Sequence, residues 1–279
     1  DPSFLEWGTM ADEKTAEMWL AREYSEGRPD YPPELFRFIA SKTPHLHLAW
    51  DVATGSGQAA QSLAKIYDQV IATDVSQNQL DFAPRLPNVL YRKTPPAMSP
   101  GDLQRVVSGE STVDLITVAQ AIHWFHLPSF YSQARWILKK PHGVVAAWCY
   151  TLPEVVPGVD AVLRRLYTGA SAPFWDPARQ MVDEAYRSID FPFDPVEGED
   201  GTGPVGFASE KEMDLERYLT YLRSWSAYRT AKEKGVELLG EDVVEEFRRA
   251  WMEDGDDRKM VRFPVYLRIG KVGNPGGPP

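Results

Sequence analysis

Between residues 46 and 150, short apolar runs alternate regularly with segments of helical composition. Five of these runs have the length and the apolar content of strands: HLAWDV, VIATDV, NVLYRK, VDLITVAQA and GVVAAWCY. They are apolar almost throughout, which is typical of strands that helices cover on both faces of a parallel sheet. The pattern therefore predicts a doubly wound α/β fold, in which ligands bind beyond the carboxyl ends of the strands.

The rhythm changes after Tyr150, which predicts additional parts around this core. Helices are expected over residues 213–228 and 240–253, where apolar residues recur at helical spacing. Before the core of residues 46–150, residues 1–9 look like a cloning remnant and residues 10–45 are expected to form N-terminal lid helices. After it, residues 151–259 are expected to form a cap and substrate region, with a segment that completes the sheet. Residues 260–272 are expected to form a last strand, and residues 273–279 a flexible tail.

Composition limits the classes of partner. The formal net charge is −10 and charges of both signs are interspersed, which argues against nucleic acid and against an anionic membrane surface. No apolar stretch reaches the roughly 20 residues of a membrane span, and we identify no signal peptide. The single cysteine, Cys149, is expected to be a buried thiol in a reducing, cytoplasmic location. No acidic cluster has ligand-like spacing, so no metal site is expected.

A glycine-rich stretch follows the first strand-like run. The sequence GSGQAA (residues 55–60) matches the dinucleotide fingerprint, and Asp74 ends the next strand-like run, where it suits ribose hydroxyls. Asp51, just before the glycines, would repel a pyrophosphate at the following helix N-terminus. A cofactor with an ammonium and a sulfonium group would tolerate this carboxylate. S-adenosylmethionine is such a cofactor.

The motif D-x-x-x-G-x-G, the acidic end of the second strand and VDLITVAQAIHWF resemble class I S-adenosylmethionine-dependent methyltransferases. Within this class the chain is similar to the small-molecule group that includes trans-aconitate methyltransferases and plant embryo-abundant-protein-like methyltransferases. The matching segments, spread over most of residues 20–270, are YSEGRPDYPPELF, DVATGSGQAA, AQAIHWFHLPSFY, FWDPARQMVDEAYRSIDFPF and YLRSWSAY.

The resemblance implies a Rossmann-like methyltransferase fold, with a mostly parallel, seven-stranded sheet and a helical cap. It also implies S-adenosylmethionine as cofactor, S-adenosylhomocysteine as product, and a small-molecule acceptor that is methylated on a carboxylate or hydroxyl oxygen. Ala53 stands where many members have a glycine. The implied cofactor contacts are Asp51, Ala53, Gly55 and Gly57 for the amino-acid part, Asp74 for the ribose, Met98 or its neighbours in TPPAM (residues 94–98) for the adenine, Gln120 and Ala121 for the methionine portion, and Tyr24 and Arg28 in the segment over the cofactor.

His123 follows the fourth strand-like run, at the edge where the ligand is expected. An imidazole with a pKa near 6.5 can accept a proton from a phenol or hydroxyl, so His123 is our candidate catalytic base, with a pocket wall as the alternative. His126 is a weaker candidate of the same kind. Trp124 either packs on the sulfonium by cation–π attraction or stacks in the core.

The cap contributes further candidate substrate residues. Trp175 and Trp225 supply aromatic surface, and Tyr228 supplies a hydroxyl near Arg223. Arg223 or Arg28 can orient a substrate carboxylate as a bidentate fork, and a surface position is the alternative for each.

Three other functions remain open at this point. The same cofactor site can steer a rearrangement or cyclisation without loss of the methyl group. The glycine loop alone also fits a nicotinamide-dependent oxidoreductase, although no Tyr-x-x-x-Lys pair is evident. A binding protein that has lost turnover is the non-catalytic alternative. The sequence does not predict the oligomeric state.

Overall fold

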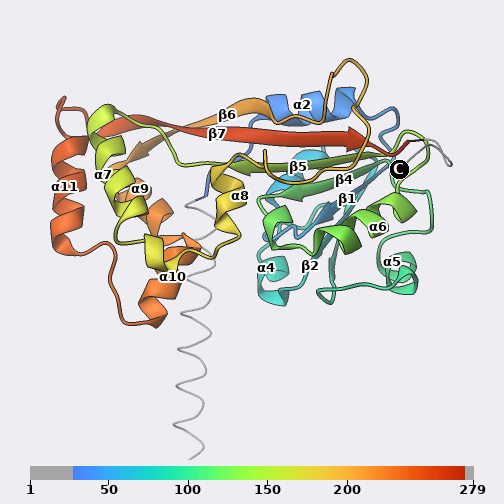
Figure 1. Ribbon diagram of the computed structural model, residues 1–279, viewed down its shortest axis with the longest axis horizontal. Coiled ribbons are helices and arrows are strands. Elements are labelled where there is room, and N and C mark those ends of the chain that lie inside the picture. Colours follow the sequence, from blue (N-terminus) through green and yellow to red (C-terminus); the bar gives the residue numbers. More distant parts are fainter. Residues whose placement is uncertain (1–27, 274–279) are drawn as a thin grey trace, which may run out of the picture. The chain divides into compact units, whose positions relative to one another are not determined.

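A computed structural model describes residues 28–273 (Figure 1). The expectations for the cloning remnant, for residues 10–27 with Tyr24, and for the tail from residue 274 lie outside the described residues. The described chain divides into two compact units. The sheet unit comprises residues 30–153, 177–210 and 262–273, and the helical unit comprises residues 28–29, 154–176 and 211–261.

The sheet has seven strands in the order β3-β2-β1-β4-β5-β7-β6, and the strand labels in Figure 1 follow this order from β6 and the red β7 down to β2. The first five pair in parallel, and β7 runs antiparallel to β5. This confirms the predicted α/β class and its mostly parallel, seven-stranded sheet. The strands are β1 (Leu48–Val52), β2 (Gln69–Asp74), β3 (Val89–Lys93), β4 (Leu115–Ala119), β5 (Val144–Tyr150), β6 (Val205–Asp214) and β7 (Arg258–Lys271).

The register brings the carboxyl ends of the central strands to one edge. Asp51 of β1 lies beside Ala72 of β2 and Thr117 of β4. Strand order reverses between β1 and β4, because β2 and β3 lie on one side of β1 and β4 and β5 on the other. Such a reversal is where doubly wound folds open a ligand crevice.

The helices of the sheet unit begin at sequence signals that are visible in the chain. The Ser76 Oγ accepts a hydrogen bond from the Gln79 amide and so caps the N-terminus of its helix. Ser99 and Asp102 form a reciprocal capping box at the start of α5. The elements are α2 (Pro33–Ser41), α3 (Gln58–Leu63), α4 (Gln77–Asp81), α5 (Pro100–Val106), the 3-10 helix η1 (Ile122–Trp124), α6 (Leu127–Ile137) and α8 (Arg179–Asp183).

The helical unit packs around large aromatic side chains: Tyr218, Phe247 and Trp251 are all fully buried. The single helix expected over residues 213–228 is wrong, because Trp225 has extended backbone angles (φ −65°, ψ 143°) and divides it into two. The elements are α7 (Pro157–Thr168), the 3-10 helix η2 (Ala172–Phe174), α9 (Leu215–Arg223), α10 (Ser226–Glu233) and α11 (Glu241–Trp251). Within residues 28–273, no helix combines the length and apolarity that crossing a membrane requires.

Candidate active site

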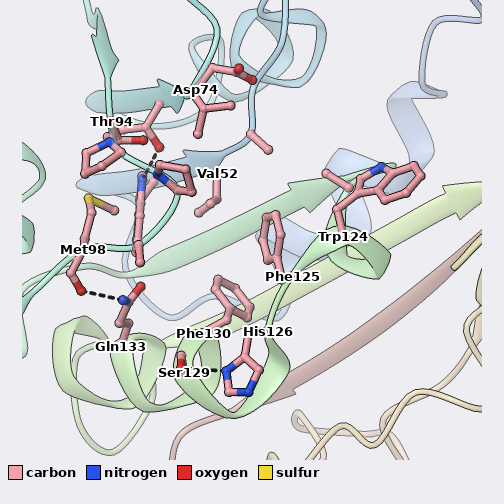
Figure 2. Close-up of a pocket in the computed structure, with 18 residues that line it drawn as sticks. Val52, Asp74, Thr94, Met98, Trp124, Phe125, His126, Ser129, Phe130 and Gln133 are labelled. Carbon is pink, nitrogen blue, oxygen red and sulfur yellow. Dashed lines mark hydrogen bonds between the residues drawn. The ribbon is translucent and has the colours of Figure 1, made fainter. Parts of the chain in front are cut away.

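A cavity of about 660 Å³ lies in the sheet unit at the carboxyl edge of the sheet. Its walls come from β1, the end of β2, residues 94–98 after β3, residues after β4 and the first turns of α6 (Figure 2). The lining is mainly apolar. Of the predicted cofactor residues, Ala53, Asp74, Met98 and Ala121 line it, and so does the predicted substrate residue Trp124. The predicted carboxyl edge is therefore hollow, and several predicted residues meet there.

Asp74 lines the cavity at the end of β2. Its Oδ2 accepts a 2.9 Å hydrogen bond from the Gly55 amide, and its Oδ1 accepts a 2.8 Å bond from the Ser76 amide. A carboxylate has about four acceptor sites, so these two bonds fix the group and leave capacity for a ligand. Donors such as the two hydroxyls of a ribose match that capacity.

In the loop after β1, every second residue has a left-handed backbone conformation. Ala53 (φ 54°), Gly55 (φ 57°) and Gly57 (φ 81°) all have positive φ, and the Gly57 amide donates to the Thr54 carbonyl at 2.9 Å. A Cβ on Gly57 would lie 2.6 Å from the hydroxyl oxygen of Tyr91. Ala53 adopts this conformation although it costs an L-residue roughly 1–2 kcal/mol. The glycines shape the loop, and Ala53 is the member of the three that lines the cavity.

Asp51 lies beneath this loop and is fully buried. Its Oδ2 accepts a hydrogen bond from the Thr54 hydroxyl at 2.5 Å, and its Oδ1 accepts one from the Thr117 hydroxyl at 2.7 Å. Burial raises the pKa of Asp51 to about 6, despite these two hydrogen bonds. Asp51 is not among the lining residues. The structure thus gives it a loop-holding position, and its contact with a cofactor ammonium stays a prediction.

Gln120 follows β4 with a positive φ of 55°. Its Oε1 accepts a 2.8 Å hydrogen bond from the Tyr150 amide, and its Nε2 lies 3.4 Å from the Tyr150 carbonyl oxygen. The side chain therefore acts as a strand partner for the end of β5 and is not part of the cavity lining. The next residue, Ala121, does line the cavity.

Of the two histidines after β4, the weaker candidate His126 lines the cavity and the preferred candidate His123 does not. His123 is 7% exposed, lies outside the lining, and has its Nδ1 2.8 Å from the Tyr186 hydroxyl oxygen. His126 lines the cavity, with its Nδ1 2.7 Å from the Ser129 hydroxyl oxygen. Trp124, between them, is 53% exposed. The histidine that this cavity presents is the one we ranked lower, and catalysis by His123 stays a prediction.

Both predicted arginines lie in the helical unit. The Arg28 Nη2 donates to the Ser224 carbonyl at 2.9 Å. The Arg223 Nη1 lies 3.1 Å from a carboxylate oxygen of Glu216, which is mostly exposed, so this ion pair contributes little stability. Each guanidinium is thus held by a neighbour of its own unit.

The aromatic candidates of the helical unit pack together. Trp175 and Trp225 have ring centroids 5.3 Å apart, and Trp225 is only 4% exposed. The Tyr228 hydroxyl donates to Glu237 at 3.1 Å, and burial, followed by this carboxylate, raises the pKa of Tyr228 to about 12. Trp225 therefore belongs to the core of the unit. Substrate contacts by these residues stay predictions.

Sequence reasoning missed the contribution of α6 to the cavity. Phe130 and Gln133 line it from this helix, and the Gln133 Nε2 donates a 2.7 Å hydrogen bond to the Met98 carbonyl (Figure 2). A signal was present in Pro128, which lies in the first turn of the helix that follows the loop after the fourth strand. The first turns of such a helix lie at the carboxyl edge, because the helix connects two parallel strands.

The chain is similar in sequence to proteins named as methyltransferases. Residues 50–147 match a family described as a methyltransferase domain. A Dictyostelium discoideum protein named as a methyltransferase is 32% identical over 258 residues, covering 90% of this chain and 93% of the relative. A Saccharomyces cerevisiae protein named as an S-adenosylmethionine-dependent methyltransferase is 25% identical over 230 residues, covering 74% of this chain and 78% of the relative.

A solved structure of an Anaeromyxobacter dehalogenans protein, named as a type II methyltransferase, is also similar. It has 33% sequence identity and a TM-score of 0.74, and the match covers 89% of this chain and 99% of the other. The family match includes the end of β1, the glycine loop, Asp74 and the residues after β4.

Proposed function

Because this chain belongs to the class I S-adenosylmethionine-dependent methyltransferases, we propose that it methylates a small molecule, on a carboxylate or hydroxyl oxygen. Its cofactor is S-adenosylmethionine, so the nicotinamide alternative is set aside. The net charge of −10 disfavours a nucleic-acid substrate and supports a small acceptor. The resemblance of residues 24–36 and 119–131 to the trans-aconitate methyltransferase group is the basis for proposing an oxygen acceptor.

The cavity at the carboxyl edge carries the assignment of the cofactor site. Asp74 keeps acceptor capacity for the ribose hydroxyls, while Val75, Met98 and Phe125 provide apolar walls for a purine. Ala53 and Ala121 are small, which allows their backbone to approach the amino-acid portion closely. When bound, the cofactor supplies a methyl group that its sulfonium already activates. The chain's own task is to position the acceptor and exclude water.

A carboxylate is our first choice of acceptor. It carries its negative charge at neutral pH and needs no proton removed, whereas a hydroxyl requires a base. His123, the predicted base, is held by Tyr186 outside the cavity lining. That Arg223 or Arg28 orients a carboxylate of the acceptor stays a prediction.

Methyl transfer is favoured over a rearrangement that keeps the methyl group, because the similar proteins are named as methyltransferases. Incubation with methyl-labelled cofactor and a panel of small carboxylic acids, phenols and amines tests this. We expect label in an ester of one acid, together with one S-adenosylhomocysteine per product. Label confined to amines would overturn the oxygen acceptor, and a product without added methyl mass would favour the rearrangement.

A further inference from the structure

Most polar side chains that line the cavity bond to one another. The Trp50 Nε1 donates to the Thr73 hydroxyl at 3.0 Å, and the His126 ring pairs with the Ser129 hydroxyl. Such pairs satisfy much of their own hydrogen-bonding capacity and make weak demands on a ligand. Two lining side chains, Asp74 and Gln133, bond to backbone groups instead, and Thr94 adds a hydroxyl that can donate or accept.

Gln133 lies on α6, is partly buried, and has its Nε2 2.7 Å from the Met98 carbonyl oxygen. A carbonyl oxygen can only accept a hydrogen bond, so the amide must present its nitrogen to Met98. This contact fixes which way the amide faces, which is otherwise ambiguous for glutamine. The Oε1 is consequently directed away from Met98. Since an amide oxygen only accepts, a ligand group that pairs with Oε1 in this cavity must be a donor.

Asp74 offers acceptors elsewhere in the same cavity. Figure 2 shows Asp74 and Gln133 toward opposite ends of the labelled wall, with Val52 and Met98 between them. The cavity thus has acceptors on Asp74 and Gln133, with the apolar side chains of Val52 and Met98 between them. An adenosine group has the complementary polarity, because its ribose hydroxyls and its 6-amino group are donors on opposite sides of a flat ring.

We propose that Gln133 is a specificity-determining residue for the cofactor, whose Oε1 accepts a hydrogen bond from the 6-amino group of the adenine. The bond from Nε2 to Met98 holds the amide in the orientation that this contact requires. The proposal rests on the S-adenosyl cofactor of the proposed function and is independent of the methyl acceptor. A 6-oxopurine presents an acceptor in the same place, so the Gln133 oxygen would face another oxygen and remain unpaired.

The test compares the binding of S-adenosylhomocysteine with that of S-inosylhomocysteine, its 6-oxo analogue, by calorimetry on the full chain. We expect the wild type to bind the adenine compound at least about tenfold more tightly. In Gln133→Leu this preference should fall to about twofold or less, because the acceptor is lost. Gln133→Glu keeps an acceptor but cannot donate to Met98 when ionised, so it should bind more weakly and still prefer adenine.

Ser132→Ala is the matched control, since Ser132 is exposed on the same helix and lies outside the cavity lining. We expect wild-type affinities and preference in this variant. Gln133→Met, which preserves side-chain length, replaces the leucine variant if thermal unfolding shows that the latter does not fold.

The outcomes test the role of Gln133 separately from the identity of the cofactor. A wild-type preference for adenine in Gln133→Leu, or loss of the preference in Gln133→Glu as well, overturns the role of Gln133. In both cases S-adenosylhomocysteine still binds the wild type, and the cofactor assignment stands. Failure of the wild type to bind S-adenosylhomocysteine overturns both.

Discussion

The Thr117 hydroxyl, on β4, donates a 2.7 Å hydrogen bond to Oδ1 of Asp51, which lies fully buried on β1. The Thr54 hydroxyl donates to the other oxygen of the same carboxylate. One buried side chain therefore joins two adjacent strands to the start of the glycine loop. Because these are neutral donors, they offset only part of the cost of burying the charge, and the pKa of Asp51 remains raised to about 6.

This raised pKa predicts how stability depends on pH. The ordinary pKa of an aspartate is 3.8, so the folded chain holds a proton on Asp51 more tightly than the unfolded chain. The resulting stabilisation is fully present below about pH 4 and is lost as the pH rises through about 6. Asp51→Asn cannot ionise, so its stability does not depend on this group. From pH 4 to pH 7, its free energy of unfolding should therefore rise relative to that of the wild type, by at most about 3 kcal/mol. Urea unfolding at both pH values measures this, and a difference that does not change with pH would contradict it.

Removing the Asp74 carboxylate should weaken cofactor binding. Asp74→Ala loses both the proposed ribose contact and the anchor of the Gly55 amide, so we expect a Kd for S-adenosylmethionine that is about 10- to 100-fold higher. Asp81→Asn, an exposed carboxylate on α4, is the control and should bind like the wild type. Calorimetry decides between these outcomes, and unchanged affinity in Asp74→Ala would rule out the ribose role.

Gly57→Ala should destabilise the loop. The residue has a φ of 81°, and a Cβ would lie 2.6 Å from the Tyr91 hydroxyl oxygen, so both backbone strain and a clash oppose the substitution. We expect a loss of about 1–3 kcal/mol in the free energy of unfolding. Gly101→Ala provides the comparison, because its nearest atom is 3.8 Å away and α5 favours alanine. Equal stability of the two variants would be inconsistent with this account.

His123 distinguishes a structural from a catalytic histidine. His123→Gln removes the imidazole that pairs with the buried Tyr186 hydroxyl, so the free energy of unfolding should fall by about 1–3 kcal/mol. If the acceptor is a carboxylate, kcat should change only a few-fold, since no proton has to be removed. Thermal unfolding and initial rates on the same preparation measure both. Unchanged stability with a rate lowered about 100-fold or more would instead identify His123 as the base.

Much of the fold could be predicted because β1 to β5 are short, apolar and separated by good helix formers. The cap was harder. β6 (Val205–Asp214) is an edge strand with many partly exposed residues, so it lacks a clear apolar run. The break at Trp225 comes from an extended residue within an otherwise helical pattern, and helical periodicity alone does not reveal it.

The candidate site was predictable where it depends on position relative to strand ends. Asp74 and Ala53 line the cavity because each closes or follows a central strand. Asp51 and His123 were harder to interpret, because their partners Thr117 and Tyr186 lie more than 60 residues away in the sequence. Spacing along a chain does not reveal which hydroxyl a buried polar group will meet.

The place of β7 in the sheet has a consequence for synthesis of the chain. β7 lies between β5 and β6, and its Arg268 donates hydrogen bonds to the carbonyls of Tyr186, Ile189 and Thr202. A ribosome delivers β7 after all of these partners. β1 to β5 can therefore pair while translation continues, whereas β6 lacks its neighbour in the sheet until β7 emerges. Chaperones and proteases that survey nascent chains meet this protein with one edge of its sheet still open.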